Sequence, residues 1–483
     1  MAGINKTRRS FLAGLGGLAV GSAATPLVRA GRKQPQEGID HNLNTTGSVH
    51  RRGQPGYERM RRDLVWQAWK PERFPDFIVN AHDEADVVET VRYARQQGLS
   101  LSVRGSGHNY IASYLREGGI LLNVAQLREV EIEDDKQLAY VQPGINSAEF
   151  SSALAERGLA FPVAHGPSVA LGGYLLGGGM GWNGEYWNRF ACYNIRAIEL
   201  VTAAGETLKV NGDEHADLFW AARGAGPAFC GVVTRYHLEV FPLPRAITSC
   251  TYIYSVDQLE NLIGWLEQAR HRQDAKIELS FILESSDTSR QCVLSAVCFA
   301  DREDEAKTLL GKLLQHVPGQ GRLVAREFQP LTFAEVLALT RTSVPSRMTT
   351  ETAWVEKTGE ALMVMSEHFN RAPSGNTVII ANYRSNTDLP EDTAYSVTGP
   401  LFLNWSARWE SASRDDEHMR WMDDLAGAIE PLMTGCYINE TDYIHRPHWV
   451  NRCFPETTRK RLAAVHARYD PGGMFPPPFA LIS

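Results

Sequence analysis

The stretch HGPSVALGGYLLGGGMG, residues 165–181, holds seven glycines in seventeen residues. Glycine has no Cβ atom, so it adopts positive φ angles and allows the backbone to approach a ligand closely. Successive free backbone amides form concave sites for anions, which favours a ligand that carries phosphate. The stretch matches neither the G-x-G-x-x-G dinucleotide loop nor the lysine-containing phosphate loop. A purely structural glycine loop therefore stays open as the alternative.

A second bare turn lies upstream, at VRGSGHNY, residues 103–110. The alternating segment LSLSV, residues 99–103, precedes the turn and predicts a short strand. His108 thus follows two glycines and a serine at a point where few side chains can pack against its ring. Either the ring hydrogen-bonds to nearby backbone or it takes part in chemistry, and the turn alone leaves both open.

The region around these two turns predicts an α+β fold with short strands rather than a regular βαβ series. Residues 83–98 predict an amphipathic helix with Gly98 just past its end, and residues 146–158 predict another with Ser147 as its N-cap. Residues 130–141 alternate around a polar turn and predict a hairpin. Further strands are expected at 119–123, 196–202 and 231–240, with a helix at 215–222.

The pattern changes after Pro242-Leu243-Pro244. From 246 to about 434, the expected strands are 276–283, 291–299, 376–382 and 401–409, and the expected helices are 256–271, 302–316 and 415–433. This mixture predicts a second domain, an antiparallel sheet with helices on one face.

The composition is that of a globular protein: 483 residues, 43% hydrophobic and 22% charged, which suits about two domains. A formal net charge of −7 gives no reason to expect a nucleic acid or an anionic membrane surface as partner. The seven cysteines are scattered and form no CxxC pair, so neither a disulfide framework nor a metal site is expected.

The first 30 residues predict an export signal. Residues 5–30 have a basic start, a Gly- and Ala-rich apolar stretch and a small-residue end at Val28-Arg29-Ala30. Arg8-Arg9 before Ser10-Phe11-Leu12 resembles the twin-arginine signal, with an ordinary secretory signal as the alternative. The apolar run is too short for a membrane span. We expect a periplasmic or secreted protein with a loose tail at 31–56, and read the basic cluster at 51–62 as a solvated linker.

Four features in order resemble the vanillyl-alcohol-oxidase superfamily of flavin oxidoreductases, and within it the berberine-bridge-enzyme-like oxidases. They are SVRGSGHNY (102–110), VALGGYLLGGGMGW (169–182), DLFWAARGAGPAFCGVVTRYHLEVFP (217–242), and the pair YINETD (437–442) and YDPGGMF (469–475). The resemblance implies a two-part PCMH-type FAD-binding domain, residues 57–245 and 435–483, with a substrate domain inserted at 246–434 and the active site at their junction.

The resemblance also implies a covalent cofactor. In the family the turn histidine is bonded through a ring nitrogen to the 8α-methyl of FAD, and His108 holds that position here. A second tether, a cysteine on flavin C6, would fall at Gly166, so we expect a single tether. Cys192 is then a core residue, and His165 packs or hydrogen-bonds beside the flavin. The expected cofactor-binding residues are Arg104, Gly105, Ser106, Gly107, His108, Asn109, Gly166, Val169, Gly172, Gly173, Gly177, Gly178, Gly179, Gly181, Val232 and Asn439.

For catalysis, the family's Y-x-N motif implies Tyr437 as the base and Asn439 as the residue that positions its neighbours. Tyr437, Asn439 and Thr441 alternate onto one side of a segment expected to be extended. A tyrosine titrates near ~10, so a nearby positive charge is expected to lower the pKa of Tyr437. A buried structural tyrosine is the alternative. In strand 401–410, either the polar or the tryptophan-bearing face can cover the flavin.

The implied reaction is hydride transfer from a substrate, an alcohol or sugar hydroxyl carbon, to FAD. Val169 falls at the family's gate position, where valine is associated with access of molecular oxygen, so we expect an oxidase that forms hydrogen peroxide. Packing beneath the flavin is the other interpretation of Val169. A dehydrogenase that uses a quinone or other carrier, and a secreted binding protein without chemistry, remain the alternative functions.

Overall fold

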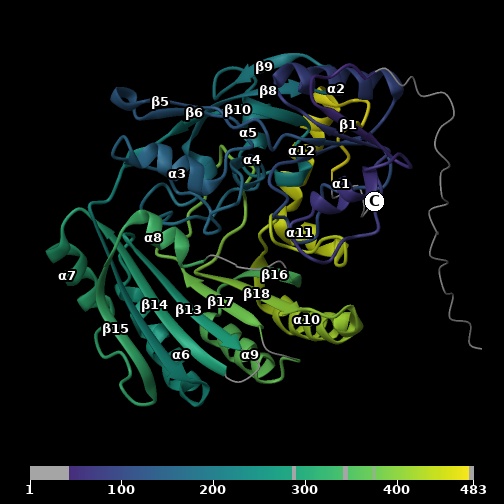
Figure 1. Cartoon of the computed structure of the whole chain (residues 1–483). Coiled ribbons are helices and arrows are strands. Elements are labelled where there is room, and N and C mark those ends of the chain that lie inside the picture. Colours follow the sequence, from purple (N-terminus) through teal and green to yellow (C-terminus); the bar gives the residue numbers. More distant parts are fainter. Residues whose placement is uncertain (1–42, 286–289, 341–345, 374–375, 478–483) are drawn as a thin grey trace, which may run out of the picture. The chain divides into compact units, whose positions relative to one another are not determined.

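The computed structural model describes residues 43–285, 290–340, 346–373 and 376–477 (Figure 1). The chain divides into two units, 1–39 and 40–483, and everything below concerns the second. The expected export signal and the first part of the expected tail lie outside the described residues. Among the helices of the described ranges, none is both long enough and apolar enough to cross a membrane.

A four-stranded sheet carries the histidine turn at the end of one of its strands. Its strands, in spatial order, are β1 (Ser48–Arg51), β2 (Phe77–Asn80), β4 (Ile120–Asn123) and β3 (Leu101–Arg104). The pairs β2–β4 and β3–β4 are parallel, and β1 is antiparallel to β2. Helix α1 (Tyr57–Asp63) precedes β2, and α2 (Glu84–Gln97) connects β2 to β3. The predicted helix and its terminal Gly98, with φ 62°, are confirmed.

An antiparallel five-stranded sheet follows. Its strands in order are β5 (Val130–Glu133), β6 (Leu138–Val141), β10 (Gly231–Glu239), β8 (Ile195–Thr202) and β9 (Thr207–Val210). The helices of this region are α3 (Ser147–Ala155), α4 (Leu171–Leu176) and α5 (Ala216–Ala222). Strands β7 (Leu159–Ala160) and β11 (Phe241–Pro242) pair by themselves. The predicted hairpin β5–β6 is confirmed.

The second half of the chain forms an eight-stranded antiparallel sheet. Its order is β15 (Arg322–Leu331), β12 (Ala246–Ser255), β14 (Arg290–Ala300), β13 (Ile277–Ser285), β17 (Val378–Tyr383), β18 (Leu401–Trp409), β16 (Arg347–Val355) and β19 (Met433–Gly435). Its helices are α6 (Leu259–Ala269), α7 (Glu303–Leu313), α8 (Phe333–Ala338), α9 (Thr358–Asn370) and α10 (Asp415–Ile429).

The two faces of this large sheet have different environments. Helix α9 contacts both α6 and α10, and the three helices lie together along one face of the sheet (Figure 1). Burial alternates along β13, so its residues face the helices and the opposite side in turn. The predicted antiparallel sheet with helices on one face is confirmed, and with it the α+β class.

The last part of the chain returns to the smaller sheets. Helix α11 (Val450–Cys453) is followed by α12 (Glu456–Tyr469), which contacts α5. Beyond α12, the carbonyl of Met474 accepts a hydrogen bond from the Leu101 amide at the start of β3. These contacts link the two ends of the described chain, while the domain boundaries at 245/246 and 434/435 stay a prediction.

Two local predictions are wrong. The N-cap of α3 is Asn146, whose side chain accepts from the Glu149 amide while the Glu149 carboxylate accepts from the Asn146 amide. This reciprocal pair satisfies two backbone donors at once, which Ser147 cannot do from inside the helix. The expected tail is also wrong for its described part, because residues 48–51 form β1, and the basic cluster continues into α1 instead of a linker.

Candidate active site

A cavity of about 990 Å³ lies between the glycine-rich turns and the open face of the eight-stranded sheet. Its wall includes the turn after β3, the segment around 164–173, the residues of β18 that face away from the helices, and the turn at 437–440. Ligand pockets in proteins typically span ~300–1,000 Å³. The cavity is therefore large enough for a sizeable cofactor and a small substrate in contact with it.

A half-buried arginine holds the turn after β3 through hydrogen bonds. Arg104 donates from Nε to the Leu64 carbonyl at 3.0 Å, from Nη1 to Asn123 Oδ1 at 3.0 Å, and from Nη2 to the Ser106 carbonyl at 2.8 Å. Gly107 has φ 78°, and a Cβ atom there would stand 2.5 Å from the Leu64 carbonyl oxygen. The turn thus needs glycine at 107 for both its conformation and its close packing.

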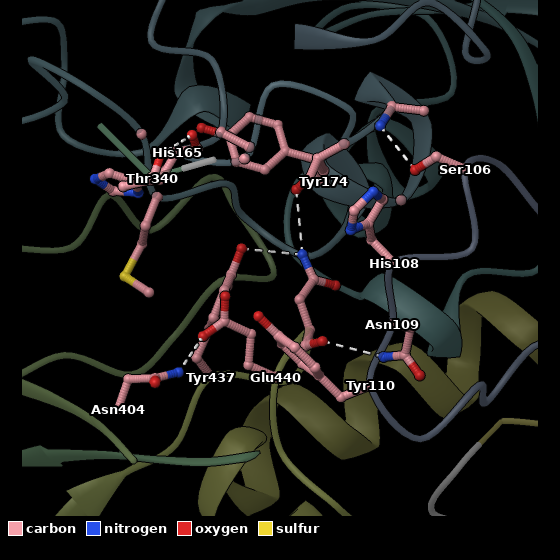
Figure 2. A pocket seen from close by; sticks show the side chains of 18 of the residues that line it. Ser106, His108, Asn109, Tyr110, His165, Tyr174, Thr340, Asn404, Tyr437 and Glu440 are labelled. Carbon is pink, nitrogen blue, oxygen red and sulfur yellow. Dashed lines mark hydrogen bonds between the residues drawn. The ribbon is translucent and has the colours of Figure 1, made fainter. Parts of the chain in front are cut away.

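The backbone of this turn is open to the cavity. In the part of the chain that the structure describes, the amides of residues 105–110 donate to no protein acceptor. Two bonds join the turn to its neighbours: Ser106 Oγ accepts from the Ala170 amide at 2.9 Å, and Asn109 Nδ2 donates to the Asn439 carbonyl at 3.0 Å (Figure 2). Three segments distant in sequence therefore meet on one wall, with free amides between them.

His108 lies on this wall with its ring held from two sides. Its Nε2 is 2.9 Å from Ser168 Oγ, and its ring centroid is 4.7 Å from that of Trp66. Burial, and to a lesser extent the charge of Arg104, lower the pKa of His108 to about 4. The imidazole is therefore neutral at physiological pH and has a nitrogen lone pair available.

Most of the predicted cofactor-binding residues line the cavity. They are Arg104, Gly105, Ser106, Gly107, His108, Asn109, Gly166, Val169, Gly172, Gly173, Gly181 and Asn439. No atom lies within 4 Å of the place where a Cβ on Gly173 would stand. A Cβ on Gly166 would come within 3.0 Å of Val169 Cγ2. Glycine at 173 therefore leaves open space along the wall, and glycine at 166 avoids a tight contact with Val169.

Three of the predicted glycines lie away from the cavity wall. Gly177, Gly178 and Gly179 are not among the described residues that line the cavity. A Cβ on Gly177 would stand 2.0 Å from Asn439 Oδ1. Gly178 has φ 113°, and a Cβ there would stand 2.6 Å from the ring of Tyr395. Their missing side chains admit protein neighbours instead of a ligand. The predicted contact of these three glycines with the cofactor stays a prediction, and their near neighbours in this structure are protein atoms.

Val232 is also absent from the described cavity wall and is fully buried in β10. Its sequence neighbours Gly231 and Val233 line the cavity. Because successive side chains of a strand point to opposite faces, the side chain of Val232 faces away from the cavity, and its predicted contact with the cofactor stays a prediction.

The segment YINETD forms a turn rather than the expected extended strand. The amides of Glu440 and Thr441 both donate to the Tyr437 carbonyl, at 3.0 and 3.1 Å. The turn still brings the two predicted catalytic side chains together, since Asn439 Nδ2 donates to the Tyr437 hydroxyl oxygen at 3.0 Å (Figure 2). Thr441 instead turns to Thr352, with 3.1 Å between the two hydroxyl oxygens.

The environment of Tyr437 differs from the prediction. Burial raises its pKa above the ordinary value, and the negative charge of Glu440 raises it further. The Asn439 side chain and the Gly179 amide, which donates to the hydroxyl oxygen at 3.2 Å, oppose this shift only in part. The main influences on the pKa of Tyr437 do not include a cation, so the expected positive neighbour is not among them, and the phenol stays protonated at neutral pH.

Sequence reasoning missed a carboxylate in this site. Glu440 lines the cavity beside Tyr437, and its Oε2 accepts from Asn404 Nδ2 at 2.8 Å (Figure 2). A second cavity carboxylate, Glu278, lies 2.6 Å from Nε2 of His165. The only signal for Glu440 in the sequence was its place directly after Asn439.

Strand β18 presents its polar side chains to the cavity. Asn404, Ser406 and Arg408 line it together with Phe402, whereas Trp405 and Trp409 are buried elsewhere. The face of β18 that covers the cavity is therefore the polar one, and the tryptophans are core residues.

The cysteines and the possible metal ligands of the described residues are arranged as follows. Each of the seven cysteines is buried and free, and burial raises the pKa of Cys192. Within the described ranges, no group of three or more His, Cys, Asp or Glu side chains is arranged to hold a metal ion.

Comparison with known proteins identifies the cofactor. Residues 75–211 match the family model of an FAD binding domain. The FAD-linked oxidoreductase nodO of Hypoxylon pulicicidum is 26% identical over 85% of this chain and 92% of its own length. The (R)-6-hydroxynicotine oxidase of Paenarthrobacter nicotinovorans is 28% identical over 85% of this chain and 92% of its own length.

The fold is shared with solved flavoenzymes. The 6-hydroxy-D-nicotine oxidase of Arthrobacter nicotinovorans superposes with a TM-score of 0.79 over 90% of this chain and 97% of its own, at 24% identity. The BBE-like 1 protein of Physcomitrella patens gives 0.78 over 90% and 96%, at 19% identity. The open amides at 105–110 and the neutral His108 suit FAD. The chain thus contains an FAD binding domain and is similar over most of its length to FAD-linked oxidoreductases, with the PCMH-type fold of the berberine-bridge-enzyme-like and 6-hydroxynicotine oxidases.

Proposed function

We propose that this oxidoreductase removes a hydride from the hydroxyl-bearing carbon of a small molecule, with FAD attached covalently through His108 alone and molecular oxygen as the final acceptor. One observation supports this most strongly. The Asn109–Asn439 bond, at 3.0 Å, joins the turn that carries His108 to the turn that carries Tyr437. A flavin tethered at the first turn therefore lies within the same cavity as the polar side chains of the second.

The residues that would hold FAD are His108, the open amides of 105–110 and the uncrowded wall at Gly173. Bound FAD supplies the acceptor for a hydride equivalent. The protein's own contribution to the tether is a neutral imidazole, kept so by burial. Gly166 cannot form a thioether, which supports a single tether.

Tyr437 has a defined hydrogen-bonding capacity toward a substrate. Its oxygen accepts from the Gly179 amide and from Asn439 Nδ2. A phenol has one O–H donor, and both of these contacts leave that hydrogen for another acceptor. In our proposal Tyr437 donates to the oxygen of the substrate hydroxyl and stabilises the negative charge that develops there, while Asn439 fixes the direction of this donation.

The experiment for this function is an anaerobic screen of the purified protein. A panel of sugars, primary and secondary alcohols and hydroxypyridine alkaloids is mixed with the oxidised protein, and the flavin absorbance is followed. The alkaloids are included because the relative described as 6-hydroxynicotine oxidase is named for one. We expect at least one compound to bleach the flavin. A ligand that binds with no bleaching would favour the non-catalytic binding protein.

Val169 gives a prediction about the electron acceptor. Its backbone is fixed by Ser147, whose amide and hydroxyl both donate to the Val169 carbonyl, at 2.9 and 3.1 Å. An added methylene in Val169→Ile therefore enters the cavity instead of being absorbed by backbone movement. We expect stopped-flow reoxidation of the photoreduced protein by dissolved oxygen to slow about tenfold or more, which corresponds to about 1.4 kcal/mol of barrier.

Val293→Ile is the matched control for this prediction, since it adds the same group to the cavity wall on β14. Its reoxidation should stay close to that of wild type. A wild type that reoxidises only over minutes, yet turns over with an artificial dye, would instead identify a dehydrogenase that uses a quinone or similar carrier.

We further propose export by the twin-arginine route. The pair Arg8-Arg9 is read by a receptor rather than as mere charge, so Arg8→Lys with Arg9→Lys should leave the precursor in the cytoplasm. Fractionation with immunodetection measures this, and the N-terminus of the mature protein should begin near Gly31. Normal export of the double variant would exclude the twin-arginine route.

A further inference from the structure

The Glu440 carboxylate lies beside Tyr437 on the cavity wall, and the proposed function has not used it. It lies directly after the Asn439 that binds the Tyr437 hydroxyl, and it faces the cavity half-buried. Among the described residues, the side-chain donor to the carboxylate is the neutral amide of Asn404 rather than an arginine or lysine. Burying an ionised carboxylate without a cationic partner costs free energy. The presence of Glu440 at this position therefore points to a functional role.

The neighbouring phenols cannot take this role. Burial raises the pKa of both Tyr437 and Tyr110, and the charge of Glu440 raises each further. A proton acceptor works best when its pKa lies near the operating pH. Burial raises the pKa of Glu440 above the usual value for a glutamate, and hence toward that range.

We propose that Glu440 is the proton acceptor of the oxidation, an inference that rests on the proposed function. The O–H bond of the substrate hydroxyl breaks and its proton moves to a Glu440 carboxylate oxygen. The C–H bond on the same carbon breaks with its electron pair, which leaves as hydride to oxidised FAD, and a C=O bond forms. Tyr437 donates to the substrate oxygen, and Asn404 holds the carboxylate toward the reacting hydroxyl.

The charged and titratable groups around Glu440 set the direction of its pH dependence. Tyr437 and Tyr110 face it as neutral phenols, and Arg408, which lies on the cavity side of β18, acts on Tyr110 from the same cavity. His165 lowers the pKa of Glu440 when it is protonated. Because the base must be ionised, the rate of flavin reduction should rise with pH through the raised pKa of Glu440 and then level off.

Glu440→Gln tests the inference, since it keeps the size and the contact with Asn404 but cannot accept the proton. General-base catalysis contributes ~10²–10⁴-fold, so the rate of flavin reduction should fall by about that factor, and the acidic limb of the pH profile should disappear. Glu278→Gln, which removes another carboxylate of the cavity wall, should retain that limb. Asn404→Leu removes the donor to the carboxylate and should move the limb to higher pH.

A second readout requires no substrate. Infrared titration of the resting holoprotein should show a protonated carboxyl band that disappears as pH rises through a midpoint above that of an ordinary glutamate, near ~4.3. The band should be present in Glu278→Gln and missing in Glu440→Gln. If Glu440→Gln fails to fold, Asn404→Leu provides the test instead. In that variant the pH midpoint at which the carboxyl band disappears should be higher than in wild type.

The outcomes separate this inference from the function itself. A wild type whose flavin no compound reduces would count against the proposed function, while the infrared titration still decides on Glu440. The role of Glu440 alone would be overturned if a compound reduces the wild-type flavin, Glu440→Gln reduces within about threefold of the wild-type rate, and the acidic limb of its pH profile persists. A threefold change in the rate of flavin reduction is less than about 1 kcal/mol of barrier.

Discussion

Flavin should stay with the wild-type chain after acid precipitation, and His108→Ala should release it to the supernatant or lose it during purification. The reason is the geometry and charge of the ring. His108 is held by Ser168 and Trp66 on the cavity wall, and its pKa of about 4 keeps a lone pair available for a bond to carbon. Absorbance of the precipitate and of the supernatant measures the effect, which should be nearly complete.

His165→Ala is the matched control, because it removes another imidazole from the same cavity wall. It should leave the flavin attached. If the flavin of the wild type washes out in acid, the covalent tether is wrong. A flavin peptide that carries a cysteinyl adduct would contradict the single tether inferred from Gly166.

Tyr437→Phe should lower the rate of flavin reduction by substrate about 10²–10³-fold, the usual effect of losing one donor to a developing oxyanion. The ring itself keeps its neighbours Tyr395 and Phe402, with centroids 6.3 and 6.2 Å away, so flavin content should persist. The Gly179 amide loses its acceptor, so the free energy of unfolding should fall by about 1–3 kcal/mol.

Tyr395→Phe is the control for this substitution. Tyr395 is buried beside Tyr437, accepts from Trp354 Nε1 at 3.2 Å, and is not among the described residues that line the cavity. It should lose stability to a similar degree and keep the rate of flavin reduction. Stopped-flow kinetics compare the two variants, and a Tyr437→Phe rate within about threefold of wild type would exclude the proposed contact.

The sequence predicted those helices and strands that are determined by nearby residues. The helix at 84–97 ends at Gly98, and β18 spans the predicted residues 401–409. Strand β16, RMTTETAWV, was missed because its many polar residues give no hydrophobic pattern, although the strand is buried inside the large sheet. Its Glu351 is fully buried and paired with Arg446, 95 residues away. Such a strand is stabilised by tertiary contacts, which a single sequence does not display.

The site divides in the same way. His108 and Tyr437 could be predicted from motifs that resemble a known family, and the structure brings their turns together. Glu440 could not, because the segment was expected to be extended and because its partner Asn404 comes from a strand 36 residues earlier. The glycines at 177 and 178 show the limit of composition. Sequence reveals that a Cβ is missing, but not whether a ligand, Asn439 or Tyr395 occupies the space.

The most direct test of the account is a crystal structure of the purified full chain with the cofactor that it acquires during expression. We predict one FAD in the cavity, its ring system bonded to the His108 imidazole and in contact with the turn at 437–440, with Glu440 and Asn404 on the substrate side. A flavin bound elsewhere, or a cavity wall in which His108 and Tyr437 face different ligands, would contradict the central claim that these two turns form one active site.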